Sequence, residues 1–265
     1  MINAIMDTEE IVNSSNIANS SSLTNAHRTL KDENEIIEST LSFVSRVSHE
    51  FRSPLTTIQT SAEILESYND RLTVEEKEKQ FQTVYESISN LSELLDDVIM
   101  FCKANTKSIK PRYEKFELIN YFKKIIEQIK NTFSEALQIN FYSETEEINI
   151  SSDKKLISQI LSNLISNSIK YSPSNQNVDV SITQLNGKAI IEVRDYGIGI
   201  PGNERHKIFT PFFRAHNTKE IAGTGLGLAI VQQLVKTLEG KINFVSNENR
   251  GTMFTVTIPV NGNVE

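Results

Sequence analysis

The segment S-H-E-F-R-S-P-L at residues 48–55 places a histidine directly before a glutamate. A neutral imidazole is a good nucleophile near neutral pH, and an adjacent carboxylate can accept the proton that the ring loses as it attacks a phosphoryl group. A lone histidine on a helix is usually an ordinary surface residue. His49 and Glu50 are therefore a candidate nucleophile and base only if the chain also carries a site for a phosphoryl donor.

A second polar pattern lies in residues 159–171, where Asn163, Asn167, Lys170 and Tyr171 recur at steps of four, three and one. This spacing places the four side chains on one side of a helix. Asparagine amides can bind Mg²⁺ through oxygen and phosphate through nitrogen, while the lysine adds positive charge and the tyrosine a ring. Taken alone, a solvated polar face would have the same pattern.

The segment R-D-Y-G-I-G-I-P at residues 194–201 ends a predicted strand. Asp195 can accept a hydrogen bond from an exocyclic amine, while Gly197 and Gly199 let the backbone turn sharply and approach a flat ligand. A simple turn at the end of a strand would look similar.

The segment G-T-G-L-G-L at residues 223–228 opens a predicted helix. Glycine amides and a helix N-terminus that face outward together form a phosphate site. The alternative is a dinucleotide-binding motif. It fails on context, because these glycines come late in the chain, no early strand-glycine-helix unit exists, and no acidic residue follows at the expected distance.

Two long helices position the candidate histidine. Apolar residues recur at alternating steps of four and three over residues 37–65, and again over residues 81–102 after a capping-box pair, Thr73 and Glu76. We expect an antiparallel hairpin over residues 36–106. Its two seams leave apolar surface uncovered unless a second copy packs against them, so a homodimeric four-helix bundle is expected.

Residues 111–262 show a different periodicity and are expected to form an α/β sandwich of the α+β kind, with helices over one face of a sheet. Strands are expected near 113–117, 138–143, 177–183, 188–194, 241–246 and 252–258, and helices near 118–133, 153–171 and 224–238. Residues 1–35 are predicted to be linker or disordered, because residues 13–25 are rich in Ser and Asn.

Charge and composition exclude several classes of protein. The 27 basic and 34 acidic residues give a net charge of −7 without a long run of one sign, which argues against a nucleic-acid partner. The single cysteine, Cys102, fits a reducing compartment, so a cytoplasmic location is expected. No stretch approaches the roughly 20 apolar residues of a membrane span, and the acidic N-terminus does not resemble a secretion signal.

Taken in order, these segments resemble the sequence boxes of the histidine kinase family over about residues 36 to 260. S-H-E-F-R-S-P-L resembles the H box, N-L-I-S-N-S-I-K-Y the N box, and D-Y-G-I-G-I-P the first glycine box. I-F-T-P-F-F-R (208–214) resembles the F box, G-T-G-L-G-L the second glycine box, and G-T-M-F (251–254) the last. The resemblance implies a phosphoacceptor hairpin followed by an ATP-binding domain of the Bergerat type.

The resemblance also implies roles for the residues. His49 would be phosphorylated with Glu50 as the base, Asp195 would read adenine, and residues 202–222 would form a lid over the nucleotide. Asn163 and Asn167 would hold Mg²⁺ and phosphate. The remaining residues expected to contact ATP are Lys170, Tyr171, Gly197, Gly199, Arg214, Gly223, Thr224, Gly225, Leu226, Gly227 and Thr252.

Two other functions compete with a kinase. Relatives that hydrolyse ATP carry a glutamate at the first N-box position to activate water, whereas this chain has Asn163, which favours transfer to histidine. A nucleotide-responsive scaffold would be expected to lack the histidine or a glycine box, and all are present. Family members that dephosphorylate their partner usually have Thr or Asn four residues after the histidine. Ser53 stands there, so phosphatase activity stays open.

The expected partners are a second copy of the chain, the receiver domain of a response regulator, and an upstream sensory protein. About 35 residues precede the hairpin, too few for a sensory domain. The sequence names neither the stimulus nor the regulator. His206 and His216, in or beside the lid, are interpreted as ordinary polar residues rather than metal ligands.

Overall fold

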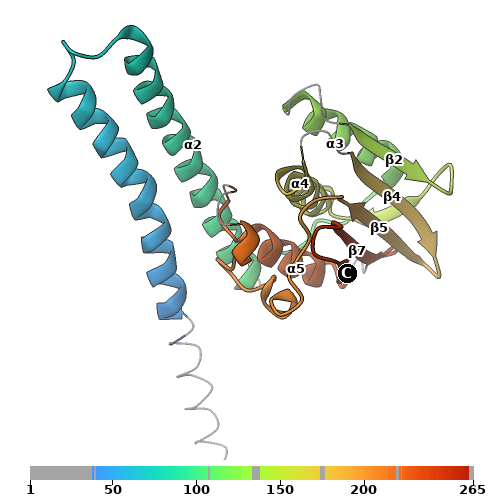
Figure 1. Cartoon of the computed structure of the whole chain (residues 1–265). Helices are drawn as coiled ribbons and strands as arrows, with labels where there is room; N and C mark the ends of the chain where they lie inside the picture. The colour runs from blue at the N-terminus through green and yellow to red at the C-terminus, as the bar shows by residue number, and fades with distance from the viewer. Residues whose placement is uncertain are drawn as a thin grey trace, which may run out of the picture. The chain divides into compact units, whose positions relative to one another are not determined.

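The computed structural model describes residues 38, 40–106, 108–132, 138–173, 177–218, 221 and 223–262 (Figure 1). The chain divides into two compact units, residues 1–53 and 54–265. In the first unit, residues 40–53 are helical and carry His49. The predicted linker over residues 1–35 lies outside the described residues.

The second unit begins with the rest of the first helix, residues 54–67, which a short turn joins to helix α2 (Val74–Asn105). The predicted capping box is present at the start of α2. The Thr73 amide donates to Glu76 Oε2 at 2.8 Å, and the Glu76 amide donates to Thr73 Oγ1 at 3.2 Å. These reciprocal bonds satisfy two amides that have no partner within the helix, which fixes where α2 begins.

Helix α2 has two apolar faces. The predicted seam, represented by Phe81, Ile88 and Leu95, is exposed in the single chain. A different stripe is buried, and it includes Leu94 and Phe101. The heptad pattern therefore identified a face that one copy of the chain does not cover.

The rest of the second unit is a two-layer α/β structure. Its helices are α3 (Leu118–Thr132), α4 (Lys154–Lys170) and α5 (Gly227–Thr237). Its strands are β1 (Glu114–Glu117), β2 (Ile139–Ser143), β3 (Asn149–Ser152), β4 (Val178–Leu185), β5 (Lys188–Arg194), β6 (Lys241–Ser246) and β7 (Thr252–Pro259). The five-stranded sheet has the order β2-β4-β5-β7-β6, with β2 parallel to β4 and the other pairs antiparallel.

The core lies between this sheet and its helices (Figure 1). Alternate residues of β4, β5 and β7 point inward, as the period of two predicts, and pairs such as Val180–Val193 and Ile191–Val256 meet across neighbouring strands. The predicted α+β sandwich is confirmed.

Two local features differ from the prediction. Strand β3 was not expected, and it pairs with β1 in a separate two-stranded sheet. Helix α5 begins at Gly227 rather than near residue 224, because Gly225 has φ +71°, a left-handed conformation that a right-handed helix cannot contain.

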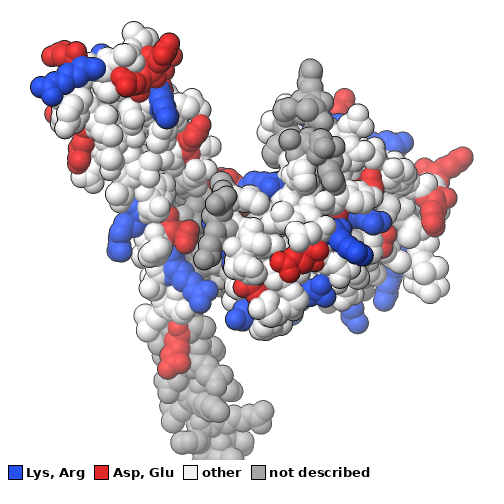
Figure 2. Space-filling model, in the orientation of Figure 1, with Lys and Arg blue, Asp and Glu red and all other residues white. Residues whose placement is uncertain are grey.

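The face of the molecule in Figure 2 shows Lys and Arg interspersed with Asp and Glu rather than gathered into a continuous basic surface. On this face the distribution agrees with the mixed charge of the sequence. Among the described residues, no helix is long and apolar enough to cross a membrane.

Candidate nucleotide and phosphoacceptor sites

Two neighbouring pockets share a wall on helix α4, because Asn167 and Tyr171 line both of them. The first pocket is largely apolar. The second is mainly polar. An apolar and a polar compartment side by side suit a ligand with a flat ring at one end and charged groups at the other.

Asp195 is the carboxylate of the apolar pocket and is only 5% exposed. Its Oδ1 accepts hydrogen bonds from the Gly197 amide at 2.9 Å and the Thr252 amide at 3.1 Å. Burial raises the pKa of Asp195, although these two amides act in the opposite direction. With Oδ1 held by the backbone, Oδ2 is the oxygen left to accept a hydrogen bond from a ligand amine.

Gly197 brings Asp195 close to the end of α4. A Cβ at this position would overlap with the carbonyl oxygen of Tyr171, and that same oxygen accepts the Ile198 amide at 3.1 Å. Only a residue without a side chain allows this approach. The first glycine box therefore closes directly onto the last turn of the N-box helix.

The polar pocket is formed by α4 and by the loop that precedes α5. Asn163 Nδ2 donates to the carbonyl of Gln159 at 3.0 Å, which leaves Oδ1 turned toward the start of α5 at Gly227. The pocket is lined by Asn163, Asn167, Lys170, Gly223, Thr224, Gly225 and Gly227 among others. The predicted N box and second glycine box thus share one pocket.

Leu226 and Arg214, two of the residues predicted to contact ATP, differ in which of their atoms can reach a ligand. Leu226 is fully buried, so only its main chain can approach a ligand. The Arg214 guanidinium lines the apolar pocket and donates to the carbonyls of Thr218, at 2.7 Å, and Ile221. In this structure the Arg214 side chain therefore links two main-chain positions of the lid segment.

Two acidic side chains of α2 were missed by the sequence analysis. Glu93 and Asp97 line the polar pocket: Lys170 Nζ lies 3.2 Å from Glu93 Oε1, and Thr224 Oγ1 donates to Asp97 Oδ2 at 2.7 Å. Burial raises the pKa of Asp97, and the Thr224 hydroxyl partly offsets this. All four residues belong to the unit of residues 54–265. Nothing in the spacing of residues on α2 distinguishes these two acids from other surface acids.

The candidate nucleophile lies in the other unit and is open to solvent. The His49 side chain is 79% exposed and the Glu50 side chain 42% exposed, with 3.9 Å between His49 Nδ1 and Glu50 Oε1. This distance is too long for a hydrogen bond, as is common for catalytic pairs without a bound substrate. Both side chains are accessible to a second protein domain.

Comparison with known proteins gives two family matches. Residues 39–107 match the His Kinase A (phospho-acceptor) domain. Residues 152–262 match the histidine kinase-, DNA gyrase B-, and HSP90-like ATPase family. Together they define a class of protein with a phosphoacceptor hairpin followed by an ATP-binding domain. The chain belongs to the sensor histidine kinases of two-component systems.

Curated relatives extend over most of this chain. Sensor histidine kinase YvrG of Bacillus subtilis is 32% identical over 236 residues, which are 88% of this chain and 41% of YvrG. Sensor histidine kinase WalK of the same species is 31% identical over 224 residues, 82% of this chain and 36% of WalK. The chain therefore spans about two fifths of the length of these relatives.

Solved structures of histidine kinases have the same fold. The catalytic domain of histidine kinase ThkA aligns with a TM-score of 0.51 and 26% identity, covering 57% of this chain and 97% of that domain. ThkA in complex with the response regulator TrrA aligns with a TM-score of 0.68 and 23% identity, over 86% of this chain and 64% of ThkA. At that identity the second similarity establishes the fold alone.

Proposed function

We propose that this chain binds Mg-ATP and transfers the γ-phosphoryl group to His49, from which it passes to an aspartate on the receiver domain of a response regulator. The proposal rests on two neighbouring pockets that share residues at the end of α4. One pocket contains the buried carboxylate of Asp195, and the other contains the polar groups of Asn163, Asn167 and Lys170. Adenine fits the first pocket and phosphates the second.

In the apolar pocket, Asp195 Oδ2 would accept a hydrogen bond from the exocyclic amine of adenine, with the ring beside Tyr171. The Gly197 and Thr252 amides hold the carboxylate in place for this contact. Residues 202–222, including Arg214, would form the lid. A carboxylate that accepts from the ring amine favours adenine over bases that present a carbonyl oxygen at the same position.

In the polar pocket, Mg²⁺ would be held by the amide oxygens of Asn163 and Asn167 together with phosphate oxygens. The donor set fits, because Asn163 keeps Oδ1 toward the pocket while its Nδ2 bonds Gln159, and because Mg²⁺ is normally held by one or two protein oxygens plus phosphates and water. When bound, the ion would neutralise charge on the phosphates. Lys170 and the loop at Gly223–Gly227 would hold the phosphates themselves.

The transfer step uses His49 and Glu50. Since Glu50 lies nearest to Nδ1, we infer that Nε2 attacks the γ-phosphorus, the bond from that phosphorus to the ADP oxygen breaks, and Glu50 takes the proton from Nδ1. The first N-box position is Asn163, which cannot activate water as a carboxylate would. Transfer to histidine is therefore favoured over hydrolysis.

We further propose that two copies pair through their hairpins. Most of the exposed large apolar side chains of the described residues lie on the two hairpin helices; those at seam positions are Leu41, Val44, Leu55, Phe81, Ile88 and Leu95. An apolar surface of this kind is characteristic of an interface. In this proposal residues 36–106 form the dimerisation and phosphotransfer hairpin, and residues 111–262 form the catalytic domain. The chain would act in the cytoplasm and receive its signal from an upstream sensory protein.

The test is incubation of the chain with γ-labelled Mg-ATP, with His49→Gln as the variant and His206→Gln, an exposed histidine of the lid, as its matched control. Label that is lost in acid, survives alkali, and is absent only from the His49 variant would establish a phosphohistidine at His49. Label that persists in the His49 variant would refute the assignment. Addition of a purified receiver domain would then test onward transfer.

A further inference from the structure

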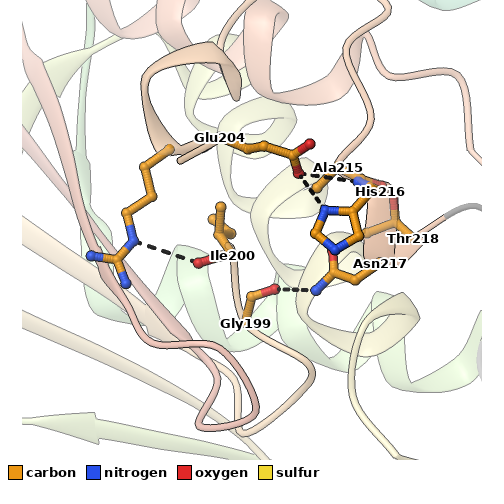
Figure 3. A network of polar contacts seen from close by, with 8 residues as sticks. Gly199, Ile200, Glu204, Ala215, His216, Asn217 and Thr218 are labelled. Atoms are coloured by element: carbon orange, nitrogen blue, oxygen red, sulfur yellow. Dashed lines mark hydrogen bonds and ion pairs between the residues drawn. The ribbon is translucent and has the colours of Figure 1, made fainter. Parts of the chain in front are cut away.

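The lid segment contains a cluster of polar contacts around two short turns, η1 (Arg205–Lys207) and η2 (His216–Thr218) (Figure 3). Glu204 Oε2 accepts two hydrogen bonds from one residue, the His216 amide at 3.1 Å and its ring Nδ1 at 3.2 Å. The Glu204 carboxylate thus links the beginning of the lid to the η2 turn, twelve residues further along the chain.

A second contact links the lid to the first glycine box, in the loop after β5. Asn217 Nδ2 donates to the carbonyl oxygen of Gly199 at 3.1 Å, while Asn217 Oδ1 is buried and accepts no hydrogen bond from the described residues (Figure 3). Figure 3 shows the Glu204 and Asn217 contacts on either side of the η2 turn. The turn is therefore fixed both to the beginning of the lid and to the first glycine box.

These contacts join two parts of the lining of the apolar pocket. One part is the loop segment 198–200, and the other includes Ala215 and Thr218, both buried. Thr218 is itself held in the turn, because its amide and hydroxyl donate to the Ala215 carbonyl at 2.9 and 2.7 Å. The shape of the pocket therefore depends on the position of the η2 turn relative to residues 198–200.

We infer that Glu204, His216 and Asn217 are positioning residues of the nucleotide site, which hold the η2 turn against residues 198–200 and so fix the shape of the pocket for the base. This inference rests on the proposed ATP site and adds residues that line neither of its two pockets. It also revises the interpretation of His216, which is part of this network rather than an ordinary polar residue.

The contacts predict a larger effect for loss of the Glu204 side chain than for loss of the His216 imidazole. Hydrogen bonds from the His216 amide and ring hold the pKa of Glu204 below its ordinary value against the opposing effect of burial, so Glu204 acts as a carboxylate near neutral pH. Removing Glu204 breaks both bonds to His216, whereas removing the imidazole leaves the amide bond in place. Lys207 favours the charged form of Glu204, while Arg205 directs its Nε to the Ile200 carbonyl at 3.5 Å.

The test measures ATP and ADP affinity for Glu204→Ala, His216→Ala, Asn217→Ala and the double variant Glu204→Ala/His216→Ala. The matched control is Glu146→Ala, because Glu146 is exposed between β2 and β3 and lines neither pocket. We expect ATP affinity to fall by about tenfold for Glu204→Ala and by about threefold for each other single variant. The double variant should equal Glu204→Ala alone, because the imidazole contributes only through Glu204.

Two readouts separate positioning from a general loss of structure. Since the contacts border the base pocket, ATP and ADP should weaken by the same factor, and autophosphorylation at saturating ATP should keep its wild-type rate. Rescue of affinity by Glu204→Gln, which retains an acceptor oxygen, would support the inference. Wild-type affinity in all variants would overturn it, as would a loss of saturating rate that follows a lower melting temperature. Absence of nucleotide binding by the wild-type chain would instead refute the proposed function.

Discussion

Replacing Asp195 with asparagine is expected to separate nucleotide binding from stability. The substitution keeps the size of the side chain and an oxygen for the Gly197 and Thr252 amides, but it places an NH₂ group where Oδ2 faces the pocket. An adenine amine would then meet a donor instead of an acceptor. The backbone contacts are retained while the contact with the ligand is lost.

The magnitude follows from the kind of bond. A hydrogen bond to a charged acceptor contributes about 2–3 kcal/mol, which corresponds to an ATP affinity weaker by about 30- to 150-fold. Asp195 is almost fully buried, so water cannot replace the missing acceptor. We expect the variant to lie toward the upper end of this range.

Stability without nucleotide should change in the opposite direction. Burial raises the pKa of Asp195 above its ordinary value of 3.8, so the charged form is disfavoured in the folded chain. A carboxyl of this kind stabilises the fold while protonated, and that contribution is lost as the pH rises through its native pKa. Asparagine does not titrate, so the melting temperature of the variant minus that of the wild type should increase between about pH 4 and about pH 7.

The assays are calorimetric titration of ATP and thermal melting of the nucleotide-free chain. Asp179→Asn is the matched control for binding, since Asp179 accepts from the Tyr196 hydroxyl at 2.6 Å and lines neither pocket. If Asp195→Asn bound ATP within about threefold of wild type, Asp195 would not be the residue that reads the base. A variant that melts lower at every pH would show that the carboxylate is needed for folding instead.

Three further predictions concern packing, capping and charge. Gly197→Ala should lower the free energy of unfolding by about 2–4 kcal/mol in urea denaturation, because the added Cβ would overlap with the carbonyl oxygen of Tyr171 at the end of α4. Gly202 has open space around it, so Gly202→Ala should change the free energy of unfolding by less than about 0.5 kcal/mol. Thr73→Ala should cost about 1 kcal/mol through loss of the capping box of α2, measured by thermal melting followed by circular dichroism; an unchanged melting temperature would contradict the role of the cap. Asp97→Asn keeps the acceptor for the Thr224 hydroxyl but removes a buried negative charge from the polar pocket. ATP should therefore bind about two- to fivefold more tightly at low salt. An unchanged or weaker ATP affinity would mean that the phosphates bind elsewhere.

The parts of the fold that local physics determines could be predicted from the sequence. The capping box of α2 needs only Thr73 and Glu76 three residues apart, and both reciprocal bonds are present. The strands around Val180 and Val256 alternate strictly because one face is buried. Asn163, Asn167, Lys170 and Tyr171 line one pocket, because helical spacing alone places them on one side of α4 and its C-cap.

What could not be predicted depends on contacts between residues far apart in the chain. Strand β3 has two serines in four residues and is a strand because it pairs with β1. The Glu204–His216 contact joins two polar residues that have no periodic pattern in the sequence. Its place next to Ala215, which lines the apolar pocket, is seen only in the folded chain. Gly197 was predicted to approach a ligand, but its Cβ position is filled by the main chain of Tyr171.

Helix α2 illustrates why a strong sequence pattern can mark an apolar face that a single chain leaves exposed. The heptad singles out Phe81, Ile88 and Leu95, which are exposed, while the buried stripe that includes Leu94 and Phe101 lies on another side of the same helix. A helix with one apolar face needs one neighbour, and α2 has two such faces. One is already buried within residues 54–265, so the seam is the face left for a second copy, and polar substitutions there should weaken pairing without unfolding the catalytic domain.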